Sequence, residues 1–346
     1  MTLMHPTMAP PSRDEGGGLT VTASAAPSPA DILRACGWLA ADEGLSRLRS
    51  LSSSHSVHLA TRSDGAEAVV KQRKPDGRRG LAPELFVYRM ASWTPALGMV
   101  IARPLHIDEG AQVLALEALP CLKRAATPQR NADFARLVGG ALAVIHSTTL
   151  DRALPPSQAA GVLDIPDHPD ATAHDRPPQT RALMHRIAED ECLADALRTA
   201  MGSYRIRCLI HGDLRPDHWV QMPDGTLRLI DWEMAGGGDP ALDFAAAIIE
   251  PALDRVRRGS TDTAWLELSR DLIVATTRGY QVGNGPIALN DPAVRAHVVR
   301  LGVARLLHVA CEWADMGGLD QAIETAIAQA HHLLANAEIA SDMITA

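Results

Sequence analysis

Two carboxylates and an imidazole lie close together in the sequence between positions 211 and 233. They belong to two segments, His211-Gly212-Asp213-Leu214-Arg215-Pro216-Asp217-His218 and Ile230-Asp231-Trp232-Glu233. Brought around one point, Asp213, His218 and Asp231 could position a hydroxyl group and hold a divalent cation. A magnesium-dependent phosphoryl transfer requires these two things. The two segments therefore predict a site for phosphoryl transfer.

Three short apolar runs surround these residues, at 206–210, 219–222 and 227–230, and each suits a β-strand. Asp224-Gly225 lies between the last two runs and is a preferred centre for a two-residue hairpin turn. Such a turn places His218 directly opposite Asp231. Opposed residues have Cβ atoms about 4.5–5.5 Å apart, so the two side chains could bind one small cation. Asp213, in the preceding loop, would lie near the metal without having to ligate it, as a general base must.

The pattern resembles the aminoglycoside phosphotransferase branch of the protein-kinase-like superfamily. That family has a catalytic motif His-Gly-Asp-x-x-x-x-Asn and a metal motif Ile-Asp-Trp/Phe-Glu. In the family a stretch Gly-Asp-Pro…Asp-Leu-Ala follows the metal motif, and Gly238-Asp239-Pro240 and Asp243-Phe244-Ala245 match it. The resemblance implies an α+β, bilobal protein-kinase-like fold, with a small antiparallel-sheet N-lobe and a mainly helical C-lobe. It also implies that Asp213 is the catalytic base and Asp231 a magnesium ligand, and that His211 orients the catalytic loop.

His218 departs from the family pattern, because it stands where Asn usually supplies a metal oxygen. Magnesium prefers hard oxygen ligands, whereas imidazole suits softer metals. We therefore expect weaker or manganese-tolerant metal binding through His218 and Asp231. Macrolide-type relatives are similar in carrying His here, so the departure does not imply an inactive enzyme. The alternative, that His218 is an ordinary satisfied side chain, stays open.

The remaining parts of a kinase site are expected upstream. Residues 67–71 form an apolar strand that ends in Lys71. The third strand of kinase-like folds places such a lysine on the α- and β-phosphates of the nucleotide. A helix predicted at 83–91 carries Glu84, which could pair with Lys71. By the same resemblance, the strand at 113–120 runs into the hinge, where backbone groups around Glu117 and Leu119 would meet the adenine.

The phosphate loop is less distinctive, because residues 51–57 contain no glycine. Ser53 and Ser54 could cover the phosphates with hydroxyl and backbone N–H groups. An ordinary serine-rich turn explains these residues equally well. The cofactors implied by the resemblance are ATP or GTP with Mg²⁺.

Composition limits the class of partner. The 346 residues are enough for two lobes. The net charge of −8 argues against nucleic acid as a partner and is compatible with a cationic substrate. The five cysteines are scattered and odd in number, as in a cytoplasmic protein with reduced thiols. We expect no membrane span and no secretory signal.

The chain divides into three expected parts. Residues 1–27 read as a disordered tail, 28–119 as the N-lobe and 120–346 as the C-lobe. A helix at 30–41 should cap the N-lobe. Further helices are predicted at 133–146, 262–279, 292–315 and 318–340, the third begun by Asp291-Pro292 in the favoured order of cap and first turn.

Two features bear on the acceptor. The segment 164–175 carries four aspartates and two histidines, and it could meet a cationic substrate or be a solvated connector. A basic cluster could instead bind an acidic peptide; its members are Lys71, Arg73, Lys74, Arg78 and Arg79. Some members of the family resemble the kinase of class V lanthipeptide and thioamitide pathways, which phosphorylates a precursor peptide before a separate lyase removes the phosphate.

Three hypotheses follow. The first is a kinase that phosphorylates a hydroxyl of a small molecule, either an antibiotic or a metabolite. The second is a kinase of Ser or Thr in a precursor peptide, with a lyase as possible partner. The third is a non-catalytic binding module of the same fold.

Overall fold

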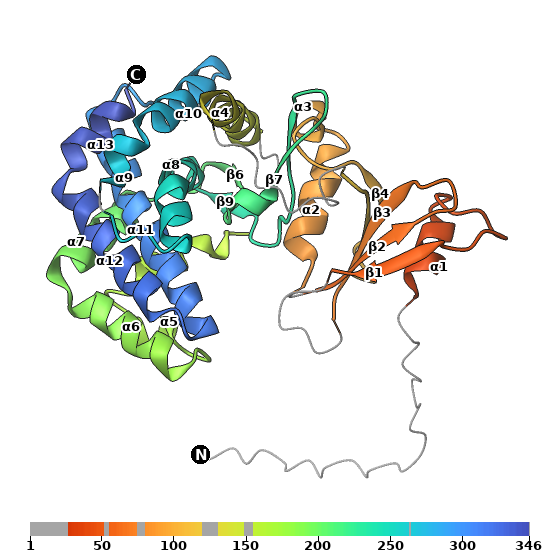
Figure 1. The fold of residues 1–346 in the computed structure, drawn as a ribbon, viewed down its shortest axis with the longest axis horizontal. Helices are drawn as coiled ribbons and strands as arrows, with labels where there is room; N and C mark the ends of the chain where they lie inside the picture. The colour runs from red at the N-terminus through yellow and green to blue at the C-terminus, as the bar shows by residue number, and fades with distance from the viewer. Residues whose placement is uncertain are drawn as a thin grey trace, which may run out of the picture.

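The computed structural model describes residues 27–51, 55–74, 80–119, 131–148, 155–262 and 264–345. Within them a five-stranded antiparallel sheet stands at one end of the molecule, and helices fill the other (Figure 1). The predicted bilobal α+β fold is therefore confirmed. Positions 1–26 of the expected tail, together with Ser53, Ser54, Arg78 and Arg79, lie outside the described residues.

The sheet has the strand order β1-β2-β3-β5-β4. Its strands are β1 (Arg47–Ser50), β2 (Ser56–Thr61), β3 (Glu67–Gln72), β4 (Pro104–Asp108) and β5 (Val113–Glu117). Alternation along β3 sends Ala68 and Val70 into one apolar cluster and Val69 into another, because successive strand residues face opposite sides. Helix α1 (Pro29–Ala35) belongs to the first cluster and α2 (Ala82–Ala91) to the second.

Helix α1 is shorter than the predicted helix at 30–41, and the difference has a local cause. Gly37 adopts a φ of +72°, and the N–H groups of Gly37 and Trp38 donate to Arg34 O and Leu33 O. These two bonds are a glycine-terminated Schellman end, which satisfies the last carbonyls of the helix. Leu39 still packs against the sheet after the chain has turned, so the predicted cap of the sheet is confirmed.

The helical lobe is built around α11 (Pro292–Met316), which packs against α6, α7, α8 and α12. Asp291 caps it as predicted, its side chain accepting from the N–H of Ala293 at 2.8 Å. The other long helices are α4 (Ala132–His146), α6 (Pro178–Glu189), α7 (Glu191–Ser203), α8 (Pro240–Arg257), α10 (Arg270–Val282) and α12 (Asp320–Ala335). The lobe also has three short helices, α5 (Pro169–Thr172), α9 (Trp265–Leu268) and α13 (Ala337–Met343), and the 3₁₀ turns η2 (Gln158–Asp164) and η3 (Pro216–His218). One more short helix, α3 (Pro95–Gly98), contacts α2.

Two predicted helices are each divided in two. The predicted helix at 262–279 breaks at Ser269, between α9 and α10. The predicted helix at 318–340 breaks at Asn336, between α12 and α13. The Asn336 side chain hydrogen-bonds His332 O at 2.9 Å. Asparagine competes with the backbone in this way, which is why it is unfavourable inside a helix.

The hairpin that follows the catalytic motif has a different register from the predicted one. Strands β7 (Trp219–Gln221) and β8 (Leu227–Leu229) pair with Trp219 opposite Leu229. The loop therefore has three residues, 223–225, with Gly225 at a φ of +82° and its N–H bonded to Met222 O at 3.0 Å. Pro223 favours this arrangement, since proline suits the second position of a type I turn and the glycine completes the bulge.

The shifted register places Ile230 opposite His218: Ile230 N donates to His218 O at 3.0 Å. The predicted direct opposition of His218 and Asp231 is therefore wrong. Their side chains nevertheless approach each other, because Asp231 lies one residue beyond the end of the pairing and has a φ of +67°. This left-handed conformation turns the chain at the metal motif, and Asp is among the residues that tolerate it.

A second small sheet was not predicted. Strand β6 (Cys208–Ile210) pairs with β9 (Gly236–Gly238), a run of three glycines. Glycine is needed there for space: a Cβ on Gly236 would lie 2.7 Å from Pro155 O. Strand β6 also begins later than the predicted 206, and Ile206 is 55% exposed. None of the helices in the described ranges has both the length and the apolarity needed to cross a membrane.

Candidate active site

Lys71 joins three segments of the chain at one ammonium group. Its Nζ lies 3.0 and 2.9 Å from the two carboxylate oxygens of Glu84 on α2. The same Nζ lies 2.6 Å from Asp231 Oδ1 in the metal motif of the helical lobe. The predicted pairing of Lys71 with Glu84 is thus confirmed. The contact with Asp231 was not predicted, and it links the sheet to the catalytic segment.

Charge decides the protonation of this lysine. Burial works to lower the pKa of Lys71, but the neighbouring carboxylates of Glu84 and Asp231 outweigh burial and hold that pKa above its ordinary value. Lys71 is therefore a fully protonated cation at neutral pH. It is 8% exposed, so it is not part of a basic surface cluster.

The backbone of the catalytic loop is hydrogen-bonded to a buried carboxylate, Asp243 on α8. Its oxygens accept hydrogen bonds from the N–H groups of His211 at 2.6 Å and Gly212 at 2.9 Å. His146, at the end of α4, lies 3.4 Å from the same carboxylate. Gly212 has a φ of +80°, and a Cβ there would meet Met234 O at 2.6 Å. This tight backbone therefore requires glycine at position 212.

His211 is a structural link between the catalytic loop and the metal motif. It is fully buried, and desolvation, followed by the charge of His218, lowers its pKa. Its Nε2 donates to Ile230 O at 3.0 Å, and its Nδ1 accepts from the N–H of Asp213 at 3.4 Å. The Trp232 ring packs beside it with a centroid separation of 4.5 Å. A neutral imidazole suits both hydrogen bonds, as a loop-orienting residue requires.

Asp213 stands next in the loop and is 6% exposed. Its Oδ1 accepts a hydrogen bond of 3.1 Å from Arg305 on α11. Burial works to raise the pKa of Asp213, but the charges of Arg305, His218 and Arg215 hold it well below its ordinary value. Asp213 is therefore an ionised carboxylate at neutral pH.

His218 and Asp231 face each other across a short gap. His218 Nδ1 lies 2.8 Å from Asp213 O. A carbonyl only accepts, so this nitrogen carries the hydrogen. Nε2 then faces Asp231 Oδ2, 3.4 Å away. A small cation placed between these two atoms could bind to both.

One carboxylate and one imidazole fit a divalent cation that is held mainly by phosphate oxygens and water. Magnesium is usually bound through one or two carboxylates together with phosphate oxygens and water. No group of three or more His, Cys, Asp or Glu side chains among the residues with assigned structure could hold a metal ion. Asp231 and His218 would therefore supply the protein donors, and other ligands would complete the shell.

The expected hinge residues lie at the end of β5. The N–H groups of Glu117 and Ala118 donate to Arg103 O at 3.0 Å and Glu67 O at 3.2 Å. The Glu117 side chain is exposed and binds Arg103 at 2.8 Å. Those two backbone donors are thus already used inside the sheet lobe. Leu119 is 7% exposed, and its backbone N–H donates to no backbone carbonyl among the described residues, which leaves it as the candidate adenine contact.

Sequence reasoning missed two residues that contact this site. Arg305 lies 92 positions after Asp213 and sits within an otherwise apolar stretch, so no local signal marks it. His55 is 2% exposed and lies 3.3 Å from the carboxylate of Glu233, at the end of the metal motif. A histidine in a serine-rich segment gives no local signal that it contacts the metal motif.

The segment 164–175 contacts the helical lobe, and its four aspartates are exposed to solvent. Asp167 binds Arg198 on α7 at 2.7 Å, and Asp170 binds His185 on α6 at 2.9 Å. Part of the segment is helical, as η2 and α5 show. These contacts pair two of its four aspartates with side chains of the helical lobe, at the surface: the side chains of Asp167 and Asp170 are 59% and 89% exposed.

A lysine paired to a helix glutamate, a carboxylate on an anchored loop and a second carboxylate after a hairpin define a kinase-like phosphotransferase. The model of the phosphotransferase enzyme family (APH) matches residues 44–279. The chain belongs to this family, and it is a phosphotransferase with an alcohol group as acceptor. No curated protein sequence matches the chain.

Solved structures show the same fold. An aminoglycoside phosphotransferase from Alicyclobacillus acidocaldarius is 15% identical, with a TM-score of 0.57 over 95% of this chain and 99% of that one. A choline/ethanolamine kinase family protein from Mesorhizobium loti is 16% identical, with a TM-score of 0.56 over 90% and 98%. Amicoumacin kinase hAmiN, solved with AMP-PNP, Ca²⁺ and Ami, is 13% identical, with a TM-score of 0.56 over 84% and 88%. At these identities the likeness concerns the fold alone.

Proposed function

We propose that this protein transfers the γ-phosphate of ATP to a hydroxyl group of a small molecule, either an antibiotic or a metabolite. The observation that carries the proposal is the convergence on one point of Lys71, Asp231, His218 and the loop of Asp213. The similar folds include proteins described as acting on an aminoglycoside, on choline or ethanolamine, and on amicoumacin. They support the small-molecule class without naming the acceptor.

Each residue has one task in this proposal. Lys71, held by Glu84, neutralises the nucleotide phosphates. Asp231 and His218 hold Mg²⁺, which supplies charge neutralisation at the phosphates when bound. Asp213 orients the acceptor hydroxyl and accepts its proton as the new oxygen–phosphorus bond forms and ADP leaves. Leu119 N–H contacts the adenine.

The peptide-kinase alternative has less support from the described residues. Lys71 is buried and paired, so it does not contribute to a surface that could bind an acidic peptide. Arg78 and Arg79 lie outside the described part of the chain. A precursor peptide is therefore one acceptor to include in the screen rather than a second proposal.

The test combines calorimetry with a transfer assay that uses Mg·[γ-³²P]ATP and a mixture of aminoglycosides, macrolides, amino alcohols and Ser/Thr peptides. We expect Asp231→Ala to lose magnesium-dependent nucleotide binding. We expect Asp213→Asn to bind nucleotide as wild type does and to transfer phosphate roughly 10²- to 10⁴-fold more slowly, the usual worth of a general base. Asp217→Asn is the matched control, since Asp217 is in the same loop with a 71% exposed side chain.

Either of two results would contradict the proposal. The first is wild-type protein that binds no nucleotide in the presence of magnesium. The second is an Asp213→Asn protein that transfers phosphate as fast as the Asp217→Asn control.

A further inference from the structure

Arg305 is a buried cation that the roles given above do not use. It projects from the middle of α11 and is 4% exposed. One of its nitrogens, Nη2, donates to Asp213 Oδ1 at 3.1 Å and to Leu214 O at 3.0 Å. A single nitrogen thus binds the side chain of one loop residue and the backbone of the next. This arrangement fixes the rotation of the Asp213 carboxylate relative to its own backbone.

The other polar atoms of Asp213 are also engaged, with one exception. Its N–H donates to His211 Nδ1 and its carbonyl accepts from His218 Nδ1. Oδ2 accepts no hydrogen bond from the residues that the structure describes. Arg215 Nε lies 3.7 Å from it, which is longer than a hydrogen bond. Oδ2 is therefore the oxygen that remains available to a ligand.

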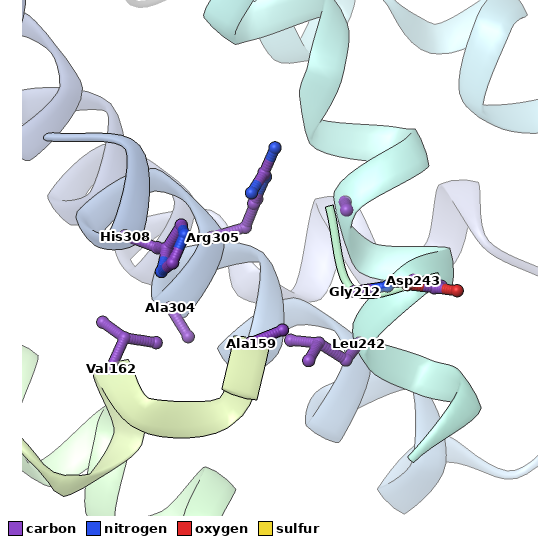
Figure 2. A pocket seen from close by; sticks show the side chains of 9 residues that line it. Ala159, Val162, Gly212, Leu242, Asp243, Ala304, Arg305 and His308 are labelled. Atoms are coloured by element: carbon purple, nitrogen blue, oxygen red, sulfur yellow. Dashed lines mark hydrogen bonds between the residues drawn. The ribbon is translucent and has the colours of Figure 1, made fainter. Parts of the chain in front are cut away.

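Stability does not account for an arginine at this position. Arg305 Nε is buried and has no hydrogen-bond partner among the described residues, and a buried donor left unpaired is destabilising. The Arg305 side chain lines a cavity of about 10 Å³, about enough for one water molecule. Figure 2 shows Arg305 and His308 on one side of this cavity, with Gly212 and Asp243 across from them. An apolar side chain would fill α11 at lower cost, since buried ion pairs contribute little net stability.

We propose that Arg305 is a positioning residue of the transfer reaction: it holds Asp213 by Oδ1 so that Oδ2 faces the acceptor hydroxyl. The inference rests on the proposed function, in which Asp213 is the base. In the step, Oδ2 takes the hydroxyl proton while the acceptor oxygen bonds to the γ-phosphorus. The bond from that phosphorus to the bridging oxygen breaks, and ADP leaves with the electron pair.

The experiment compares Arg305→Met with Arg295→Met. Arg295 is on the same helix and is 9% exposed, but it binds Ser341 and the carbonyls of Leu289 and Asn290, away from the catalytic loop. The assay follows the γ-phosphate of Mg·ATP, with water alone and with the acceptor mixture described above. It yields kcat and the KM for ATP separately.

We expect Arg305→Met to lower kcat roughly 10- to 100-fold, the effect of a misplaced catalytic group, with the KM for ATP within about twofold of wild type. Arg305→Lys, which keeps the charge but not the planar fork, should recover part of kcat. Arg295→Met should leave kcat unchanged even if it lowers the melting temperature. Should the Met variant not fold, Arg305→Lys alone should still show a reduced kcat at an unchanged KM.

Two results would overturn the inference, and they can be told apart. Wild-type turnover with unimpaired Arg305→Met or Arg305→Lys would exclude the role of Arg305 and leave the proposed function standing. Absence of turnover in the wild type, with water and with the acceptor mixture, would overturn the proposed function and this inference with it.

Discussion

At the scale of single residues, the contact between Lys71 and two carboxylates deserves the first test. Glu84 is completely buried and binds Lys71 through both oxygens. Asp231 shares the same ammonium. In the proposed function Lys71 neutralises the nucleotide phosphates, and Glu84 is the carboxylate that keeps the lysine in place.

We predict that Glu84→Gln weakens both activity and stability. The neutral amide leaves Lys71 paired with Asp231 alone, so kcat for phosphate transfer should fall by about tenfold or more. Because one buried partner of a charged hydrogen bond is lost, the free energy of unfolding should fall by about 1 to 3 kcal/mol. Urea denaturation measures the second quantity.

The control for this change is Glu109→Gln. Glu109 also pairs with a basic side chain, that of Arg89, at 2.8 Å, but both side chains are about half exposed. Exposed pairs contribute about 0 to 1 kcal/mol, so this variant should unfold close to wild type. Equal unfolding free energies for the two variants would contradict the structural role of Glu84.

At the scale of elements, the crossing of α4 and α10 positions the side chains that support the catalytic loop. Helix α4 ends in His146 and α10 carries Tyr280, whose hydroxyl lies 3.0 Å from His146 Nδ1. His146 in turn contacts Asp243, which accepts hydrogen bonds from the N–H groups of the catalytic loop. The two helices approach so closely at Gly139 that a Cβ there would lie 2.0 Å from Thr276 O.

We predict that Gly139→Ala destabilises the protein by about 1 to 3 kcal/mol, because an added methyl must force the two helices apart. The matched control is Gly202→Ala on α7, where an added Cβ meets nothing within 4 Å. That control should be neutral, or stabilising by up to about 1 kcal/mol, since alanine favours a helix. Thermal unfolding followed by circular dichroism distinguishes the two, and an unaltered melting temperature for Gly139→Ala would rule out the close crossing.

The hairpin illustrates why an element can be predicted while its register is not. The apolar runs at 219–222 and 227–230 correctly indicate two strands. Both a two-residue and a three-residue loop are compatible with Pro223-Asp224-Gly225, and the choice between them moves every cross-strand partner by one residue. Tertiary contacts favour the longer loop: Leu229 N donates to Val100 O of the sheet lobe at 2.7 Å.

At the scale of the whole molecule, buried ionisable groups should confine maximal stability to a window of pH. Burial works to raise the pKa of Asp243, but the hydrogen bond and charge of His146 hold it below its ordinary value. The pKa of Asp239 is lowered against its burial by His297. Burial raises the pKa of Cys311 and that of Tyr204, each to about 12.

These shifts have opposite consequences at the two ends of the scale. A carboxylate with a lowered pKa in the folded state contributes stability above its unfolded pKa, and this stability is lost as the pH falls. A thiol or phenol with a raised pKa contributes stability that is lost as the pH rises past its unfolded value. We therefore predict a plateau in the free energy of unfolding between about pH 5 and pH 8, with losses on both sides.

Urea denaturation between pH 3 and 10 measures this plateau. Asp243→Asn should lower the stability at neutral pH and make its fall below about pH 5 shallower. Asp133→Asn is the control, because Asp133 has a 78% exposed side chain on α4, and it should keep the pH dependence of wild type. A free energy of unfolding that increases as the pH falls from about 5 to about 3 would contradict the prediction.

The sequence by itself determined the fold class and the residues around which the site is built. His211, Gly212, Asp213 and Asp231 lie within a span of 21 residues, and local rules on loops, glycine and hairpins suffice to bring them near one another. Lys71 and Glu84 followed from strand and helix patterns together with the family resemblance. Such signals are short-range, so they can be read along the chain.

Only the tertiary structure decided what surrounds these residues. Arg305 reaches Asp213 from α11, and His55 reaches Glu233 from the sheet lobe. Strand β9 needs glycine at 236 and 238, because Pro155 and Ser157 leave no room for a side chain on the first and Ile210 of β6 leaves none on the second. Contacts of this kind depend on how helices and sheets pack over distances of many residues. No periodicity or motif in the neighbourhood of Arg305 encodes its contact with Asp213.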